Sequence, residues 1–252
     1  MTYSIEAAVK RLLLIALTLS APLALADEHL VPEANQFTRA ALPNGASSLA
    51  PYYDMVISLV GDAYTRDVRA RVIVMPSYAP EYALGIRERD GAYAIFHLGF
   101  DTNIWHYKML ESLKKMNPSV FDESIVQGLN DAIAELEELL PKDFQDVGVE
   151  RCEIAIEPEF GKDILSVWHT MLLQTRYAPS RNVGQDGTDY HFSMPGNAQY
   201  LSGKAWEPPL DSDAGRLVSI AETMKNLCIT GDVNLLGQLQ PQVDDMLARL
   251  GG

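Results

Sequence analysis

The sequence predicts an α+β domain in which an antiparallel sheet, built from hairpins, packs against several amphipathic helices. Two hairpins are indicated, one around Asp90-Gly91 and one around Pro195-Gly196-Asn197, because alternating apolar runs flank both turns. An Asp-Gly pair between such runs is a strong hairpin signal, since both residues tolerate the backbone of a tight turn. Helical periodicity in several other stretches indicates the packed helices. Neither an internal repeat nor a low-complexity linker divides the chain, so we expect a single domain.

Residues 1–26 are typical of a secretory signal peptide. A basic pair, Lys10-Arg11, precedes an apolar run, and Ala24-Leu25-Ala26 provides the small residues that a signal peptidase accepts. The apolar stretch is about 15 residues, shorter than the ~20 that span a bilayer as a helix. We therefore expect cleavage before Asp27, a periplasmic or secreted protein, and no stable membrane anchor afterwards.

The first half of the remaining chain begins with a segment, residues 27–50, that is rich in Ala, Pro, Asn and Ser and is expected to be mobile. The single domain then covers residues 51–252. Apolar residues at i, i+4, i+7, i+8 and i+11 predict a helix from about Pro51 to Tyr64. An antiparallel meander over residues 71–98 and an irregular helix from about Ile104 follow. Spacings of 4, 4, 3 and 4 then predict an amphipathic helix over residues 125–140.

The second half alternates between strands and helices in the same way. Residues 149–156 predict a strand that carries Cys152, and a helix is expected from Pro158. After a loop over residues 178–187, the second hairpin uses residues 188–194 and 198–205. Two final helices are predicted, one through Leu217 and Leu227 to Cys228 and a short one over residues 233–250.

The charge and the cysteines limit the classes of partner and compartment. The 252-residue chain has a net charge of −14, and removing 26 residues that carry Glu6, Lys10 and Arg11 leaves 226 residues at −15. Such a surface repels phosphate, so we expect no nucleic-acid partner, whereas a basic protein partner is favoured electrostatically. No glycine-rich phosphate loop is present, and we expect no cofactor. The two cysteines, Cys152 and Cys228, predict a disulfide in an exported protein.

One strand carries the residues that most resemble a catalytic group. In the stretch from Asp186 to Ser193, alternation places Asp189, His191 and Ser193 on one face and aromatic residues on the other. An Asp, a His and a Ser are the members of a nucleophilic triad, but same-face neighbours on a strand are about 6.6 Å apart. No G-x-S-x-G elbow is present either. We favour the alternative, a half-buried strand whose polar face meets water.

The histidines and the large aromatic residues are the other candidates for a functional site. None of the five histidines has a metal-binding spacing to another, so no metal site is predicted. A site built from His191, Asp189 and a distant histidine is the alternative. Trp105, Tyr107 and Trp206 are either core residues, which we favour, or exposed anchors of a binding surface.

Three motifs and a cysteine follow one another in the second half of the chain: Asp186-Gly-x-x-Tyr-His-Phe192, Gly203-x-x-Trp206-x-Pro208, Gly215-Arg-Leu-Val-x-Ile-Ala221 and then Cys228. This pattern resembles a signature of small exported proteobacterial proteins of unassigned function, and the stretch Val74–Tyr82 resembles the upstream half of that signature. The resemblance implies a single exported domain with paired cysteines and implies no chemistry.

Three functions follow as hypotheses. The first, which we favour, is a periplasmic protein that acts by binding another protein, such as an inhibitor or immunity protein of an exported enzyme. The acidic surface would suit a basic partner. The second is a hydrolase that uses His191 with Asp189 or Asp186. The third is an envelope protein that binds a small ligand. The absence of a catalytic motif favours a protein that is not an enzyme.

Overall fold

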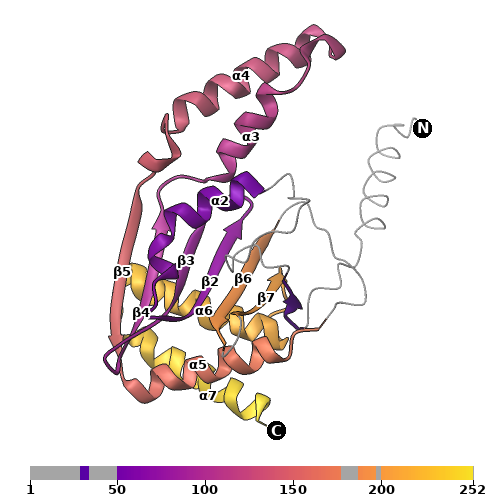
Figure 1. Ribbon diagram of the computed structural model, residues 1–252. Helices are drawn as coiled ribbons and strands as arrows, with labels where there is room; N and C mark the ends of the chain where they lie inside the picture. The colour runs from indigo at the N-terminus through magenta and orange to yellow at the C-terminus, as the bar shows by residue number, and fades with distance from the viewer. Residues whose placement is uncertain (1–28, 34–49, 177–186, 197–199, 252) are drawn as a thin grey trace, which may run out of the picture.

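A computed structural model describes residues 29–33, 50–176, 187–196 and 200–251 of the chain. These residues form one sheet of seven antiparallel strands in the order β1-β7-β6-β2-β3-β4-β5, with helices on both of its faces (Figure 1). The predicted α+β fold is therefore confirmed. No helix within the described ranges is long and apolar enough to cross a membrane. The predicted signal peptide, Asp186 and Asn197 lie outside the described residues.

Hairpins join β2 to β3, β3 to β4 and β6 to β7. Asp90 and Gly91 both have positive φ, 52° and 81°, which is the backbone that a two-residue hairpin turn requires. Residues opposite each other in the second hairpin include Met194 and Leu201. The strands are β1 Val31–Pro32, β2 Val68–Pro76, β3 Tyr82–Arg89, β4 Ala92–Phe100, β5 Val149–Ile156, β6 Thr188–Pro195 and β7 Tyr200–Trp206.

The helices begin and end close to the predicted positions. The predicted helix over residues 51–64 is divided at Val60 into an α-helix and a short 3-10 helix, η1, at Gly61–Tyr64. The C-terminal helix occupies Asn234–Leu250, almost the whole range predicted for it, and contains Pro241. The α-helices are α2 Ala50–Leu59, α3 Trp105–Lys114, α4 Glu123–Leu139, α5 Pro158–Leu173, α6 Asp213–Thr230 and α7 Asn234–Leu250.

The sheet has a hydrophobic core on each face because side chains alternate along every strand. On one face, Val72, Leu84 and Phe192 pack against α5, α6 and α7, and Trp168 of α5 is fully buried among them. On the other face, Ile73 and Phe96 pack against α2 and η1. With both faces covered, the central strands are apolar on both sides.

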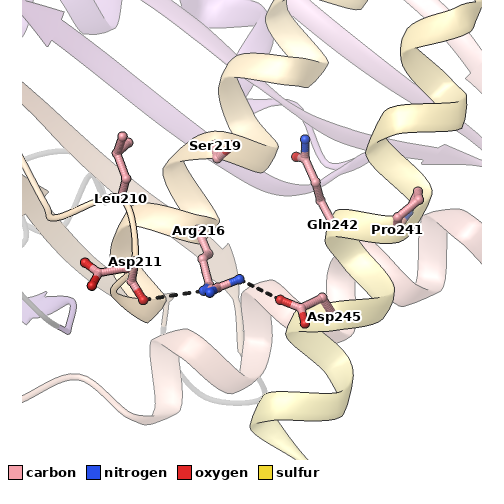
Figure 2. Close-up of a pocket in the computed structure, with 7 residues that line it drawn as sticks. All are labelled: Leu210, Asp211, Arg216, Ser219, Pro241, Gln242 and Asp245. Atoms are coloured by element: carbon pink, nitrogen blue, oxygen red, sulfur yellow. Dashed lines mark hydrogen bonds and ion pairs between the residues drawn. The ribbon is translucent and has the colours of Figure 1, made fainter.

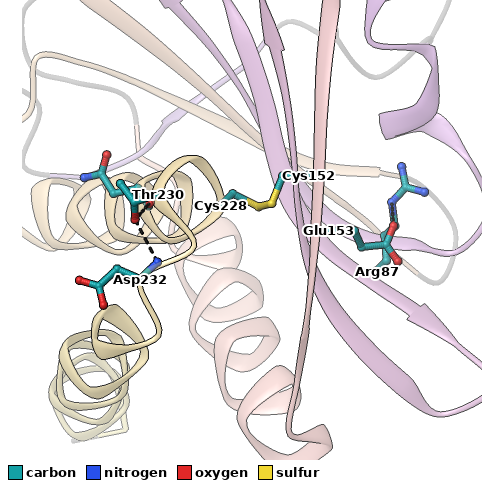
Figure 3. Close-up of a disulfide and its surroundings, with 7 residues drawn as sticks. Arg87, Cys152, Glu153, Cys228, Thr230 and Asp232 are labelled. Carbon is teal, nitrogen blue, oxygen red and sulfur yellow. Dashed lines mark hydrogen bonds and ion pairs between the residues drawn. A yellow bond between two sulfur atoms is a disulfide. The ribbon is translucent and has the colours of Figure 1, made fainter.

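The disulfide between Cys152 and Cys228 is present, as predicted. It joins β5, at one edge of the sheet, to α6, and the two Cα atoms are 5.7 Å apart (Figure 3). The next residue, Glu153, points to the opposite face of β5, where its Oε2 lies 3.9 Å from Nε of Arg87. The edge strand is therefore joined covalently to α6 on one face, and on the other face Glu153 is near Arg87 of β3.

Helices α3 and α4 form a pair that stands away from the sheet, which we call the α3–α4 arm (Figure 1). Lys114 of α3 forms an ion pair with Glu137 of α4 at 2.6 Å, and the Tyr107 hydroxyl donates to the Pro141 carbonyl at 2.9 Å. Within α4 only Leu136 is buried. The tip of the arm exposes four apolar side chains, Met116, Val120, Phe121 and Ile125.

The N-terminal strand β1 lies within the segment that was expected to be mobile. Val31 is opposite Lys204 and Pro32 is opposite Gly203, so β1 pairs with β7 and forms the edge of the sheet. Proline is tolerated at such an edge because its missing N–H faces away from the sheet. Leu30 is fully buried in the core shared with α5, α6 and α7, and its burial explains why this short piece is ordered.

Candidate binding site

The polar face of β6 is aligned as predicted but does not meet water. Asp189, His191 and Ser193 lie opposite Met75, Ile73 and Arg71 of β2. His191 is 2 % exposed and Ser193 is 1 % exposed. The expectation of a solvated polar face is therefore corrected for these two residues; the side chain of Glu33, just after β1, lies against His191 on this face.

The partner of His191 is Glu33, which the sequence analysis did not identify. The imidazole Nδ1 lies 2.7 Å from Glu33 Oε1, and both side chains are 2 % exposed. The Ser193 Oγ has no hydrogen-bond partner among the described residues. The Asp-His-Ser group is thus not joined by hydrogen bonds. Glu33 is 158 residues from His191 in sequence and carries no local pattern that would have signalled this contact.

The remaining member of that strand face, Asp189, lines a pocket with a volume of about 350 Å³. We call it the Trp105 pocket. It lies between α2, the end of β2, the first turns of α3 and the start of β6. The residues that line it are Tyr52, Tyr53, Met75, Pro76, Ser77, Tyr78, Trp105, His106, Met109 and Asp189.

Three tyrosines and a tryptophan are among the ten residues that line this pocket. The Tyr52 and Trp105 rings have centroids 5.1 Å apart and planes at 81°, so they meet as a corner. Tyr53 lies 5.6 Å from Tyr52 on the other side. Trp105 is 36 % exposed and Tyr78 is 81 % exposed, which places both at the mouth of the pocket. Trp105 therefore occupies the position of an exposed anchor, the alternative that the sequence analysis left open.

The buried carboxylate of Glu81 holds Tyr52 and Trp105 in position. Glu81 is fully buried and accepts hydrogen bonds from the Tyr52 hydroxyl at 2.7 Å, the Ile104 N–H at 2.7 Å and the Trp105 N–H at 3.0 Å. Burial raises the pKa of Glu81, while these hydrogen bonds favour the charged form. Glu81 thereby joins α2 to the start of α3, where two backbone N–H groups need acceptors.

The charged groups around the pocket are negative. Burial raises the pKa of Tyr53 to about 12, and the nearby charges of Asp189 and Glu33 act in the same direction. Neither lysine nor arginine occurs among the described residues that line the pocket. His106 contributes a buried Nδ1 atom that has no hydrogen-bond partner within the described ranges.

The other two predicted anchors lie elsewhere. Tyr107 lies within the α3–α4 arm, where its hydroxyl donates a hydrogen bond to the Pro141 carbonyl. Trp206 packs on Gly187, since a Cβ added to that glycine would lie 2.6 Å from the indole Nε1. Neither residue lines the Trp105 pocket. The three aromatic residues singled out from sequence are therefore not brought together.

A second hollow lies on the α6–α7 side of the molecule (Figure 2). Its volume is about 510 Å³, and it is lined by Leu210, Asp211, Arg216, Ser219, Pro241, Gln242 and Asp245. Arg216 is already paired with Asp245 at 2.7 Å, and no aromatic ring lines this groove within the described chain. It is therefore a weaker candidate for recognition than the Trp105 pocket.

Neither metal chemistry nor similarity to other proteins identifies the site. Within the described parts of the chain, no group of three or more His, Cys, Asp or Glu side chains is arranged to hold a metal ion. Comparison of the chain with protein-family models, curated proteins and solved structures finds no match. The function must therefore be inferred from the geometry of the chain itself.

Proposed function

We propose that this chain is an exported protein that acts by binding, and that the Trp105 pocket receives a group of its partner. The observation that carries the proposal is the corner of Tyr52 and Trp105 beside Asp189. Tyrosine, tryptophan and methionine are enriched at recognition surfaces, and ligand pockets typically enclose about 300–1,000 Å³. The pocket is held in shape by the buried Glu81, so little ordering is needed when a partner binds.

The kind of partner we propose is another protein outside the cytoplasm, as for an inhibitor or immunity protein. The disulfide supports export because such bonds persist in oxidising compartments. The net charge of −14 favours association with a basic surface. The exposed apolar tip of the α3–α4 arm, at the end of α3 away from the pocket, offers a separate contact surface. A small ligand of the cell envelope, taken by the same pocket, is the alternative.

The hydrolase hypothesis has less support from the geometry. A general base must lie within hydrogen-bond reach of the nucleophile that it activates. His191 is 2 % exposed and is engaged by Glu33, while Ser193 Oγ makes no hydrogen bond within the described chain. The His191–Glu33 pair is better explained as a contact that fixes β1 against β6.

A site-specific photocrosslinker tests the proposal. With p-benzoylphenylalanine in place of Tyr78, 81 % exposed at the mouth, we expect crosslinked adducts of defined mass in the producing cells. Adding Trp105→Ala should remove them. The matched control places the crosslinker at Leu210, which is 84 % exposed on the α6–α7 side, and should yield none of these adducts.

Two results would contradict the proposal. One is the same adducts from both crosslinker positions, and the other is adducts that persist with Trp105→Ala. Circular dichroism and thermal unfolding of the Trp105→Ala protein establish that a lost adduct does not reflect a lost fold.

A further inference from the structure

The charge and the ring geometry of the Trp105 pocket point to one class of ligand. We infer that the pocket binds an organic cation, a guanidinium or ammonium group, carried either by an arginine or lysine side chain of a partner or by a free amine. This inference rests on the proposed function, since it names the chemistry that the same pocket selects.

The aromatic side chains that line the pocket favour a cationic ligand. A cation is attracted to the face of Trp and Tyr rings, by about 2 kcal/mol or more where water is excluded. Trp105 is 36 % exposed and offers ring surface to a bound group, while the 3 % exposed Tyr52 packs edge-on against it, with the ring planes at 81°, and holds it in place. Tyr53 extends this wall, and Tyr78 stands at the mouth. Walls of this kind form the aromatic cages that hold alkylammonium groups.

The charged side chains at the pocket are carboxylates, which also favour a cation. Asp189 lines it, and its charge acts on both Tyr52 and Tyr53. Glu81 lies behind Tyr52, and Glu33 acts on Tyr53. An anionic ligand would be repelled by these carboxylates, and the described lining residues include no lysine or arginine to pair with it. A cationic ligand would instead be paired with Asp189.

The closest arginine along β2 is directed elsewhere. Arg71 lies four residues before Met75 on the same strand face, which is about 13 Å at the rise of a β-strand. Its guanidinium lies 4.0 Å from the centre of the Tyr64 ring and 5.1 Å from that of Tyr200. The molecule thus already holds one guanidinium between tyrosine rings, away from the pocket.

The unpaired nitrogen of His106 is not offered to a ligand. Its Nδ1 has no hydrogen-bond partner among the described residues, but it is buried beneath the surface of the pocket. The N–H donors of a guanidinium or ammonium group are therefore expected to pair with Asp189, the carboxylate that lines the pocket.

The experiment is a calorimetric titration of the protein with two probes of nearly equal shape. Nα-acetyl-L-arginine amide carries the cation, and Nα-acetyl-L-citrulline amide replaces the guanidinium with a neutral urea. We expect the arginine probe to bind at least about tenfold more tightly, because the neutral probe loses the ring and carboxylate attraction. Agmatine, a free amine that also carries a guanidinium group, distinguishes a free amine from a partner's side chain as the natural ligand. It should bind more tightly than the arginine probe if the natural ligand is a free amine, and more weakly if the natural ligand is a side chain.

Variants assign the effect to the pocket. Asp189→Asn should weaken the arginine probe about tenfold and leave the citrulline probe unchanged. Asp163→Asn makes the same change of charge on α5, on the opposite face of the sheet, and should alter neither. Trp105→Leu should weaken both probes because it removes a wall that each contacts.

The outcomes separate the two proposals. Equal binding of the arginine and citrulline probes, or no binding of any cationic probe, overturns the inference of a cation. Binding by the pocket still stands in either case if the crosslinks at Tyr78 depend on Trp105. If those crosslinks also fail, both proposals fall.

Discussion

Glu81 is a buried carboxylate whose hydrogen bonds go to groups that shape the Trp105 pocket. It accepts from the Tyr52 hydroxyl on α2 and from the N–H groups of Ile104 and Trp105 at the start of α3. A single side chain therefore sets the angle between two helices that have few other contacts. From the sequence it is an acidic residue before a strand, and nothing in that pattern predicts its role.

We predict that Glu81→Gln destabilises the protein by about 2–3 kcal/mol, because its amide group would place a donor against N–H donors. Tyr52→Phe should cost less, about 1 kcal/mol, since the carboxylate keeps its two backbone partners. Urea unfolding followed by circular dichroism measures both. Equal stabilities for Glu81→Gln and wild type would show that the carboxylate does not hold this junction.

His97 is a second buried residue whose environment has a measurable consequence. It is 6 % exposed on β4, its ring lies 5.5 Å from that of Tyr82, and it is near Lys225. Burial, assisted by the charge of Lys225, lowers the pKa of His97 from 6.5 to about 4. The folded protein therefore holds this imidazole neutral at mildly acidic pH.

The pH dependence follows from this shift. Above about pH 6.5 the imidazole is neutral in both states and contributes no slope. As the pH falls from about 6.5 to about 4, the unfolded chain binds a proton first, so folding stability is lost, by on the order of 3 kcal/mol in all. We predict that His97→Gln reduces the slope of unfolding free energy in this window. A slope equal to that of wild type would refute the assignment.

At the scale of elements, the sequence predicted the helices and hairpins well because each has a local signal. The period of α4 and the Asp90-Gly91 turn are examples. The sequence does not determine where an amphipathic helix packs. The apolar stripe of α4 resembles that of a core helix, yet α4 packs mainly on α3 and stands off the sheet. The same stripe is compatible with both arrangements, since tertiary contacts decide between them.

The arm is predicted to open more readily than the body. None of the residues of α3 is buried, and in α4 only Leu136 is, whereas α6 buries nine residues. Amides of the α3–α4 arm should therefore exchange with deuterium at least about tenfold faster than those of α6. Hydrogen exchange followed by mass spectrometry measures this. Equally slow exchange in α4 and α6 would mean that the arm is covered in solution.

The pairing of Glu33 with His191 illustrates why sites are harder to predict than elements. Alternation along β6 correctly placed Asp189, His191 and Ser193 on one face. The residue that engages His191, however, comes from the opposite end of the chain, beside a strand of two residues that is too short to give a pattern. The prediction of a disulfide succeeded across 76 residues only because cysteines are so few.

At the scale of the whole molecule, the Trp105 pocket is a product of topology. Its walls come from residues 52–53, 75–78, 105–109 and 189, which are local neighbours only after the sheet has formed. The sequence alone singled out Trp105 and Asp189, each for a separate reason. Their convergence depends on the pairing of β2 with β6, which joins the two hairpin systems.

The disulfide should supply a large part of the stability of this fold. Closing a loop of 76 residues removes conformational freedom from the unfolded chain, a contribution of about 4 kcal/mol. We predict this loss of unfolding free energy for the Cys152→Ala/Cys228→Ala protein. Reducing agent should destabilise wild type similarly and leave the double variant unchanged. A double variant as stable as oxidised wild type would contradict the prediction.

The same bond divides the chain into a closed covalent ring and a linear remainder. The ring contains α5, β6, β7 and most of α6, while the α3–α4 arm belongs to the linear part. One proteolytic cut inside the ring therefore leaves every fragment tethered, whereas one cut at the tip of the arm leaves two pieces held only by packing. On a non-reducing denaturing gel, a chain cut once inside the ring still runs as one species, whereas a chain cut once at the tip of the arm runs as two fragments. The covalent ring therefore gives residues 152–228 a tolerance to cleavage that the arm lacks.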